Sequence, residues 1–159
     1  MRHSELKEQV QIEFENLHLV ATEIKGILAV TAGRDPSNVE RTAAGAYLAQ
    51  FYGGIENIMK RFVKNLGGRM PSGDAWHVAM AQMFVDGSEN GMPVLFSREQ
   101  FTILSEYRKC RHAVRNCYGH ELVWDKLHPL MERLPEVIKW FEDSVAKAVD
   151  NIAREYSSD

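Results

Sequence analysis

The hydrophobic and polar positions of this chain follow a helical period over most of its length. No stretch alternates apolar and polar residues in the way that a half-buried strand does. Between residues 5 and 32 the apolar residues recur at intervals of three, four and seven, at Leu6, Val10, Phe14, Leu17, Ile24 and Leu28. Such spacing places side chains on one face of an α-helix. The pattern therefore predicts an all-α fold.

Capping and turn residues mark the ends of the first two helices. Ser4 is a candidate N-cap for the first helix, and the turn-rich residues 33–37 (GRDPS) are expected to end it. Ser37 or Asn38 is expected to cap the second helix, because short polar side chains there can accept hydrogen bonds from free backbone N–H groups. The glycine pair at 67–68 is expected to end this helix.

A short third helix and a long last helical region are predicted on similar grounds. Asp74 is a candidate cap for a helix over residues 75–85, and residues 86–96 (DGSENGMPVLF) have the composition of a loop. The last region is expected to run from about Asp125 to about Glu155. We expect an interruption at Leu134-Pro135, because a proline disfavours helical geometry in the residue before it.

The fourth helix carries the clearest start signal. Ser97 and Gln100 have the spacing of a capping box, which predicts a helix over residues 98–118 that Gly119 ends. About five helices with short connections form an antiparallel up-and-down bundle, and 159 residues suit one domain spanning 1–159.

Composition narrows the class of protein. Hydrophobic residues make up 45% and charged residues 26% of the chain, as in ordinary folded domains. No apolar run approaches the roughly 20 residues needed to cross a membrane, and the charged start lacks the pattern of a signal peptide, so a cytoplasmic protein is expected. Cys110 and Cys117 are expected to be buried thiols on one helix face, too far apart to bridge.

Positive charge is concentrated on the fourth predicted helix although the whole chain has a formal charge of -3. Residues 97–120 hold five Lys and Arg against two Asp and Glu. On a helical wheel Cys110, Ala113, Val114 and Cys117 share the side expected to face the core. The opposite side carries Arg108, Arg111, His112, Arg115, Asn116 and Tyr118.

This basic face has two interpretations. It is either a solvated face near a helix C-terminus, where the helix dipole favours cations, or a site for an anion. From Tyr107 to His120 no acidic residue interrupts it. Because neighbouring like charges are mildly destabilising, the run favours an anionic ligand or a neighbouring chain as the missing partner.

The sequence RNCYGH at residues 115–120 is an R-x4-H motif with a polar residue directly after the arginine. With AYLAQFYGGIEN, WHVAMAQM and RHAVRNCYGHEL, it resembles the HepT-like branch of the HEPN-domain ribonucleases, over about residues 5–155. The resemblance implies a HEPN-like bundle that pairs as a homodimer and cleaves RNA as a toxin. It also implies an antitoxin partner, a minimal nucleotidyltransferase, that adenylylates a tyrosine near the motif.

Two overlapping registers of the motif compete. The family commonly has R-x4-H-x-Y. Arg111, Asn116 and Tyr118 fit this longer pattern with Asn in the histidine position, in which case the general base is either lost or supplied by His112. Arg115 and His120 fit R-x4-H and are followed by Leu122 rather than Tyr. We favour the second register for catalysis because it contains both chemical groups, and Tyr118 as the modified tyrosine.

The reaction that the resemblance implies needs proton transfer and a positive site for phosphate. Histidine suits the first and arginine the second, and Asn116 could fix a phosphate oxygen or orient an imidazole. Glu56 is expected to lie near the fourth helix and orient an arginine, and Tyr52 to line the same cleft. The glycine pair 53–54 is expected to let another helix approach closely. His77 is expected to be a core or rim residue rather than a catalytic one.

Neither a cofactor nor a metal is expected. The remaining histidines, His3, His18 and His128, are scattered, and no glycine pair is followed by the Lys-Ser/Thr of a phosphate-binding loop. A rival interpretation is a HEPN-like bundle that has lost catalysis and only binds the nucleotidyltransferase, since Asn116 stands where one register needs histidine. A further one is an unrelated helical bundle with a crowded basic face.

Overall fold

The computed structural model of this chain, which describes residues 2–87 and 91–157, is built from helices. Five α-helices and one turn of 3-10 helix follow each other within the described residues. They are α1 (Arg2–Thr31), α2 (Asn38–Asn65), α3 (Trp76–Gln82), α4 (Arg98–Asn116), η1 (Gly119–Glu121) and α5 (Trp124–Ser157). The predicted all-α bundle of about five helices is confirmed.

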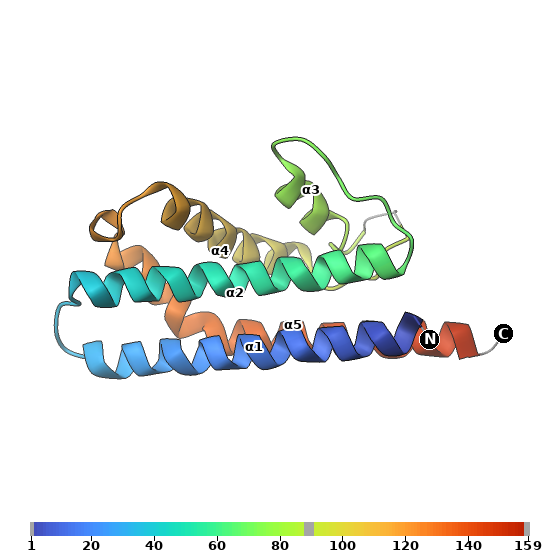
Figure 1. The fold of residues 1–159 in the computed structure, drawn as a ribbon, viewed down its shortest axis with the longest axis horizontal. Helices are drawn as coiled ribbons and strands as arrows, with labels where there is room; N and C mark the ends of the chain where they lie inside the picture. Colours follow the sequence, from blue (N-terminus) through green and yellow to red (C-terminus); the bar gives the residue numbers. More distant parts are fainter. Residues whose placement is uncertain (1, 88–90, 158–159) are drawn as a thin grey trace.

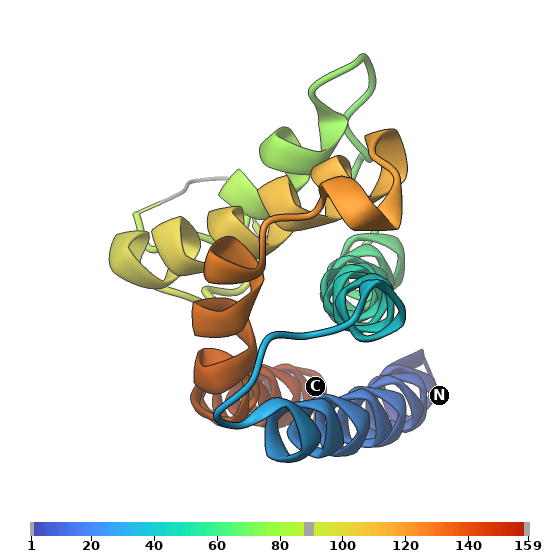
Figure 2. The ribbon, with the colours of Figure 1, turned by 90° about the vertical axis from the view of Figure 1, so that its left-hand side faces the viewer.

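The long helices run antiparallel to their neighbours. Helix α2 lies between α1 on one side and α4 on the other, and each of the two runs against it (Figure 1). Helix α5 returns along α1, which brings the two ends of the chain to the same end of the bundle. The short α3 packs on α2, on the side of the molecule where α4 lies (Figure 2).

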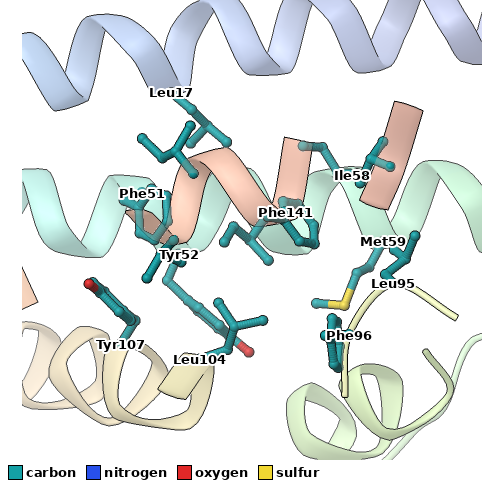
Figure 3. Packing of buried hydrophobic residues seen from close by; sticks show 14 of the residues in the cluster. Leu17, Phe51, Tyr52, Ile58, Met59, Leu95, Phe96, Leu104, Tyr107 and Phe141 are labelled. Carbon is teal, nitrogen blue, oxygen red and sulfur yellow. The ribbon is translucent and has the colours of Figure 1, made fainter. Parts of the chain in front are cut away.

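The hydrophobic core extends along α2 and takes side chains from every long helix. Leu17 of α1, Phe51 of α2 and Phe141 of α5 converge with Leu104 and Tyr107 of α4 (Figure 3), and each is nearly or fully buried. The Tyr107 hydroxyl donates to the carbonyl of Leu130 over 2.7 Å. The core thus holds α4 against α2 and α5 through its first half.

The close helix approach expected at the glycine pair occurs at its second member. A Cβ on Gly54 would lie 2.5 Å from Leu17 Cδ2, so α1 packs directly on this backbone. Gly53 instead faces the guanidinium of Arg111, where a Cβ would lie at an ordinary contact distance of 3.8 Å from Cζ. Gly54 therefore makes room for α1, whereas Gly53 lies against a side chain of α4.

Two of the predicted helix starts are confirmed. Ser37 caps α2 and Ser97 caps α4, each through a complete capping box. The candidate caps Ser4 and Asp74 are wrong, because α1 already begins at Arg2 and α3 follows Ala75 with no side-chain cap. Both helices have tertiary contacts, which outweigh a local capping signal.

Two expected boundaries also change. α3 ends at Gln82 rather than at residue 85, since Met83 and Phe84 turn with hydrogen bonds back to Met80 and Ala81. α4 ends at Asn116, two residues before Tyr118, because Cys117 adopts an extended backbone.

The expected interruption at Leu134-Pro135 does not occur, because α5 is continuous through both of its prolines. Leu134 and Val137 on either side are fully buried, and this packing compensates for the hydrogen bond that Pro135 cannot donate. The helix axis bends instead: its first part crosses the end of the bundle and its second part follows α1 (Figures 1 and 2).

Residues 88–90 of the expected loop at 86–96 lie outside the described residues. The rest of this loop folds back and pairs with the end of the α3 region. Leu95 donates its backbone N–H to the Phe84 carbonyl over 2.9 Å, and Asp86 donates to Phe96 over 3.0 Å. This pairing is a single bridge, and no strand forms in the described part of the chain. Across residues 2–87 and 91–157, none of the helices combines the length and apolar character that a membrane span requires.

Candidate functional site

A cavity of about 430 Å³ opens beside the second half of α4. α4 contributes a row of basic and titratable side chains, α2 contributes Tyr52, and the start of α3 closes the other side. Its lining residues are Tyr52, Asp74, Ala75, His77, Val78, Arg108, Lys109, Arg111, His112 and Arg115. We call it the basic pocket. The structure therefore gathers most of the predicted basic face around one hollow.

A buried carboxylate organises the wall of the basic pocket. Glu56 of α2 is only 1% exposed, and its two oxygens accept from two different elements. Arg111 of α4 donates to Oε1, and the ring nitrogen Nδ1 of His77 of α3 donates to Oε2. The structure thus brings Glu56 to an arginine of α4, Arg111, and adds His77, which was expected from the sequence to be a core or rim residue.

The geometry around His77 restricts its ring. Trp76 lies against the imidazole with ring centroids 3.6 Å apart and the planes tilted by 31°. Lys60 of α2 places its Nζ 4.9 Å from the centre of the Trp76 ring, a cation–π contact that holds the indole on α2. The imidazole is therefore held between an aromatic face and a carboxylate, in one orientation.

Tyr52 lines the basic pocket as a neutral hydroxyl. Its side chain is 2% exposed, and burial raises the pKa of the phenol well above its ordinary value, with the Glu56 carboxylate acting in the same direction. The phenol therefore keeps its proton at neutral pH. It can donate a hydrogen bond to an anion but cannot serve as a base.

The expectation that the basic residues of α4 lack partners holds for only some of them. Arg111 pairs with Glu56, and Lys109 forms an ion pair of 3.5 Å with Glu106 one turn earlier. Arg108 and Arg115 have no ion pair with any described residue. The helical wheel showed only the charges on α4 itself, so it did not include the carboxylate of Glu56 on α2. Two arginines in the pocket wall remain available for an anion.

Asn116 and His112 interact on the last turn of α4. The Asn116 side-chain amide donates to the carbonyl of His112 over 2.8 Å and lies 3.5 Å from its Nε2. Both residues are exposed. Of the first register, Arg111 and His112 line the basic pocket, and Asn116 adjoins His112 at the helix end.

Tyr118 and His120 lie on the turn after α4, outside the lining of the basic pocket. Their rings stack with centroids 5.8 Å apart and planes 7° apart, and Tyr118 is 75% exposed. Arg41 of α2 donates to the His120 carbonyl over 3.3 Å. Gly119 fits against α2 so closely that a Cβ would lie 1.8 Å from the Thr42 hydroxyl oxygen. We call residues 117–122 the terminal turn.

The expectation of two buried cysteines is wrong for one of them. Cys110 is half-buried, and burial raises the pKa of its thiol to about 11. Cys117 is exposed, because α4 ends one residue earlier and the helical spacing no longer applies to it. Within the described residues, no group of three His, Cys, Asp or Glu side chains is arranged to hold a metal ion.

Comparison with known proteins places the chain in a family. The model of a family described as HepT-like protein matches residues 43–152, from α2 to near the end of α5. The matched span contains the basic pocket and the terminal turn. The chain belongs to the HepT-like family, as the sequence resemblance indicated. No match was found among curated proteins or among solved structures.

Proposed function

We propose that this protein is a toxin-type endoribonuclease that needs no metal and binds the RNA phosphate at the basic pocket. The observation that carries the proposal is the pocket itself, where Arg108 and Arg115 have no acidic partner among the described residues and flank Arg111 and His112. Guanidinium groups bind phosphate oxygens in pairs and stay charged. HepT-like membership supports nuclease activity in general terms.

The proposed chemistry begins with removal of the proton of a ribose 2′-hydroxyl. The 2′-oxygen then attacks the adjacent phosphorus, the bond to the 5′-oxygen breaks, and that oxygen takes a proton. The products are a 2′,3′-cyclic phosphate and a 5′-hydroxyl. Arginines stabilise the more negative transition state, and histidines move the protons. In the register we favour, Arg115 and His120 carry these roles, whereas in the other one they fall to Arg111 and His112, with Asn116 fixing an oxygen.

We further propose that two protomers pair with their motifs facing each other. Arg115 and His120 lie on the exposed end of α4 and on the terminal turn, so a two-fold related copy can place both motifs in one cleft. Within one protomer His120 does not line the basic pocket. A homodimer would bring the terminal turn of one protomer toward RNA held at the pocket of the other.

The proposed antitoxin is a minimal nucleotidyltransferase that adenylylates Tyr118. This phenol is 75% exposed, so an enzyme can reach its hydroxyl without unfolding the turn. The attached phosphate would place negative charge beside the basic residues of α4 and compete with RNA. Coexpression with the nucleotidyltransferase should add the mass of one or more AMP groups, and Tyr118→Phe should abolish the increase. An unchanged increase in Tyr118→Phe would exclude this site.

The activity is tested with purified protein and RNA in EDTA. We expect cleavage that ends in 2′,3′-cyclic phosphates and falls by roughly 10²-fold or more in Arg115→Ala and in His120→Ala. A preparation in which both variants cleave as fast as the wild type would disprove the favoured register. Loss of activity in Arg111→Ala and His112→Ala alone would assign it to the other register.

A binding-only function is the second candidate, favoured by Asn116 in the histidine position of one register and by its bond to His112. Growth separates the two functions. An endoribonuclease expressed alone in the cytoplasm should arrest the cell, whereas a bundle that only binds the nucleotidyltransferase should leave growth unchanged.

A further inference from the structure

The basic pocket contains a second histidine that does not belong to the motif. His77 comes from α3, 21 residues away in sequence from Glu56 and on the wall opposite the basic row of α4. The reaction proposed above uses two proton transfers, and each register of the motif offers one histidine, His112 or His120. The pocket thus holds, within one chain, a group of the type that the motif lacks.

The hydrogen bond to Glu56 selects the tautomer of the neutral His77 ring. A carboxylate only accepts hydrogen bonds, so in the neutral imidazole Nδ1 carries the proton and the other nitrogen, Nε2, has the lone pair. Across residues 2–87 and 91–157 no other hydrogen bond to this ring occurs, and the side chain is 31% exposed. Nε2 is therefore available to a ligand in the pocket.

Charged groups from three parts of the chain surround His77. Arg111 shares the Glu56 carboxylate with it, and the pocket wall also carries the other basic residues of α4 and Asp74. Glu56 is placed to stabilise the imidazolium once Nε2 has taken a proton. The titratable and charged groups that face His77 are Tyr52 and Glu56 from α2, Asp74 before α3, and the basic row of α4 described above.

From this geometry we infer that His77 is a catalytic residue, the general base that takes the 2′-hydroxyl proton, with Glu56 as its positioning residue. The inference rests on the proposed ribonuclease function. Nε2 of His77 accepts the proton, the 2′-oxygen forms its bond to phosphorus, and the bond to the 5′-oxygen breaks. The histidine of the catalytic register, His120 or His112, gives a proton to that oxygen. With His112, one pocket holds both acid–base groups; with His120, the acid comes from the terminal turn of the paired protomer.

The test compares two histidines that each pair with a glutamate across helices. His77→Asn keeps a side-chain N–H for Glu56 and removes the base. His18→Asn is the matched control, because His18 of α1 lies 2.5 Å from Glu142 of α5, away from the basic pocket. Cleavage of a short single-stranded RNA is measured in EDTA, and binding is measured with the same RNA carrying 2′-O-methyl groups, which cannot react.

We expect His77→Asn to lower kcat by about 10²-fold or more, with RNA binding and the melting temperature unchanged, and His18→Asn to cleave at the wild-type rate. The acid limb of the pH profile should disappear in His77→Asn. Free imidazole should restore cleavage to His77→Gly, which a purely structural role would not allow.

The outcomes separate the two proposals. If the wild type cleaves RNA and His77→Asn cleaves equally fast, or if imidazole fails to rescue a folded His77→Gly, the assignment of His77 is wrong and the ribonuclease function stands. If the wild type cleaves no RNA, both fall together.

Discussion

The basic pocket beside the second half of α4 and the terminal turn that follows α4 present their functional groups in opposite ways. In the pocket, a buried carboxylate fixes Arg111 and His77, and three helices contribute to the wall. On the turn, Tyr118 and His120 stack on each other in the open, and their backbone is held through Arg41 and Gly119. The pocket is suited to holding a ligand in one geometry, and the turn to meeting another molecule.

The largest effect on stability is expected from Arg111→Ala in the pocket. Among the described residues, this substitution leaves the buried Glu56 with His77 alone as its partner, and removing one partner of a buried charge costs about 3 kcal/mol. Arg115→Ala, on the same helix but exposed, should change the free energy of unfolding by less than about 0.5 kcal/mol. Urea unfolding of the two variants measures the difference.

A double variant tests whether the charge left on Glu56 causes the loss of stability in Arg111→Ala. Glu56→Gln in the Arg111→Ala background removes the stranded carboxylate and should recover part of the lost stability. If Arg111→Ala and Arg115→Ala unfold at the same urea concentration, the buried pair does not organise the pocket wall.

A smaller loss is expected when the terminal turn is pushed away from α2. Gly119→Ala places a methyl group where the Thr42 side chain lies, and overpacking of this kind costs about 1–3 kcal/mol. Gly26→Ala in α1 is the control, because a Cβ there meets nothing within 4 Å and Ala is the better helix former by up to about 1 kcal/mol. Thermal melting should shift down for the first and up for the second. A Gly119→Ala protein as stable as the wild type would show that the terminal turn can move away from α2 without loss of stability.

The smallest effect concerns the two thiols, Cys110 where α4 packs against the core and Cys117 in the terminal turn. Burial raises the pKa of Cys110 to about 11, so at pH 8 its thiol stays protonated and unreactive, and its thiolate appears only as the pH rises toward that value. The exposed Cys117 should therefore react first with iodoacetamide, and Cys117→Ser should abolish the fast phase seen by mass spectrometry. Equal labelling of both cysteines at pH 8 would mean that α4 opens near the pocket.

Local signals predicted the fold well because they act within a few residues. The helical period of the first helix, the cap at Ser37 or Asn38 and the capping box at Ser97 each depend on residues close together in the sequence, and the structure has helices that start at both serines. Signals that compete with packing failed. Pro135 does not end α5, since Leu134 and its buried neighbours hold the helix together, and Asp74 does not cap α3.

The sequence by itself determined the helical class, the basic run on α4 and the family resemblance, because periodicity, composition and short motifs are all local. Only the tertiary structure decided which charges meet. Glu56 lies 55 residues from Arg111 and 21 residues from His77; from the sequence, Glu56 was expected to meet an arginine of the fourth helix, without indication of which one, and it was not paired with His77. Their contact depends on how α2, α3 and α4 pack. A buried carboxylate needs hydrogen-bond partners, and packing of the core decides which elements lie close enough to provide them.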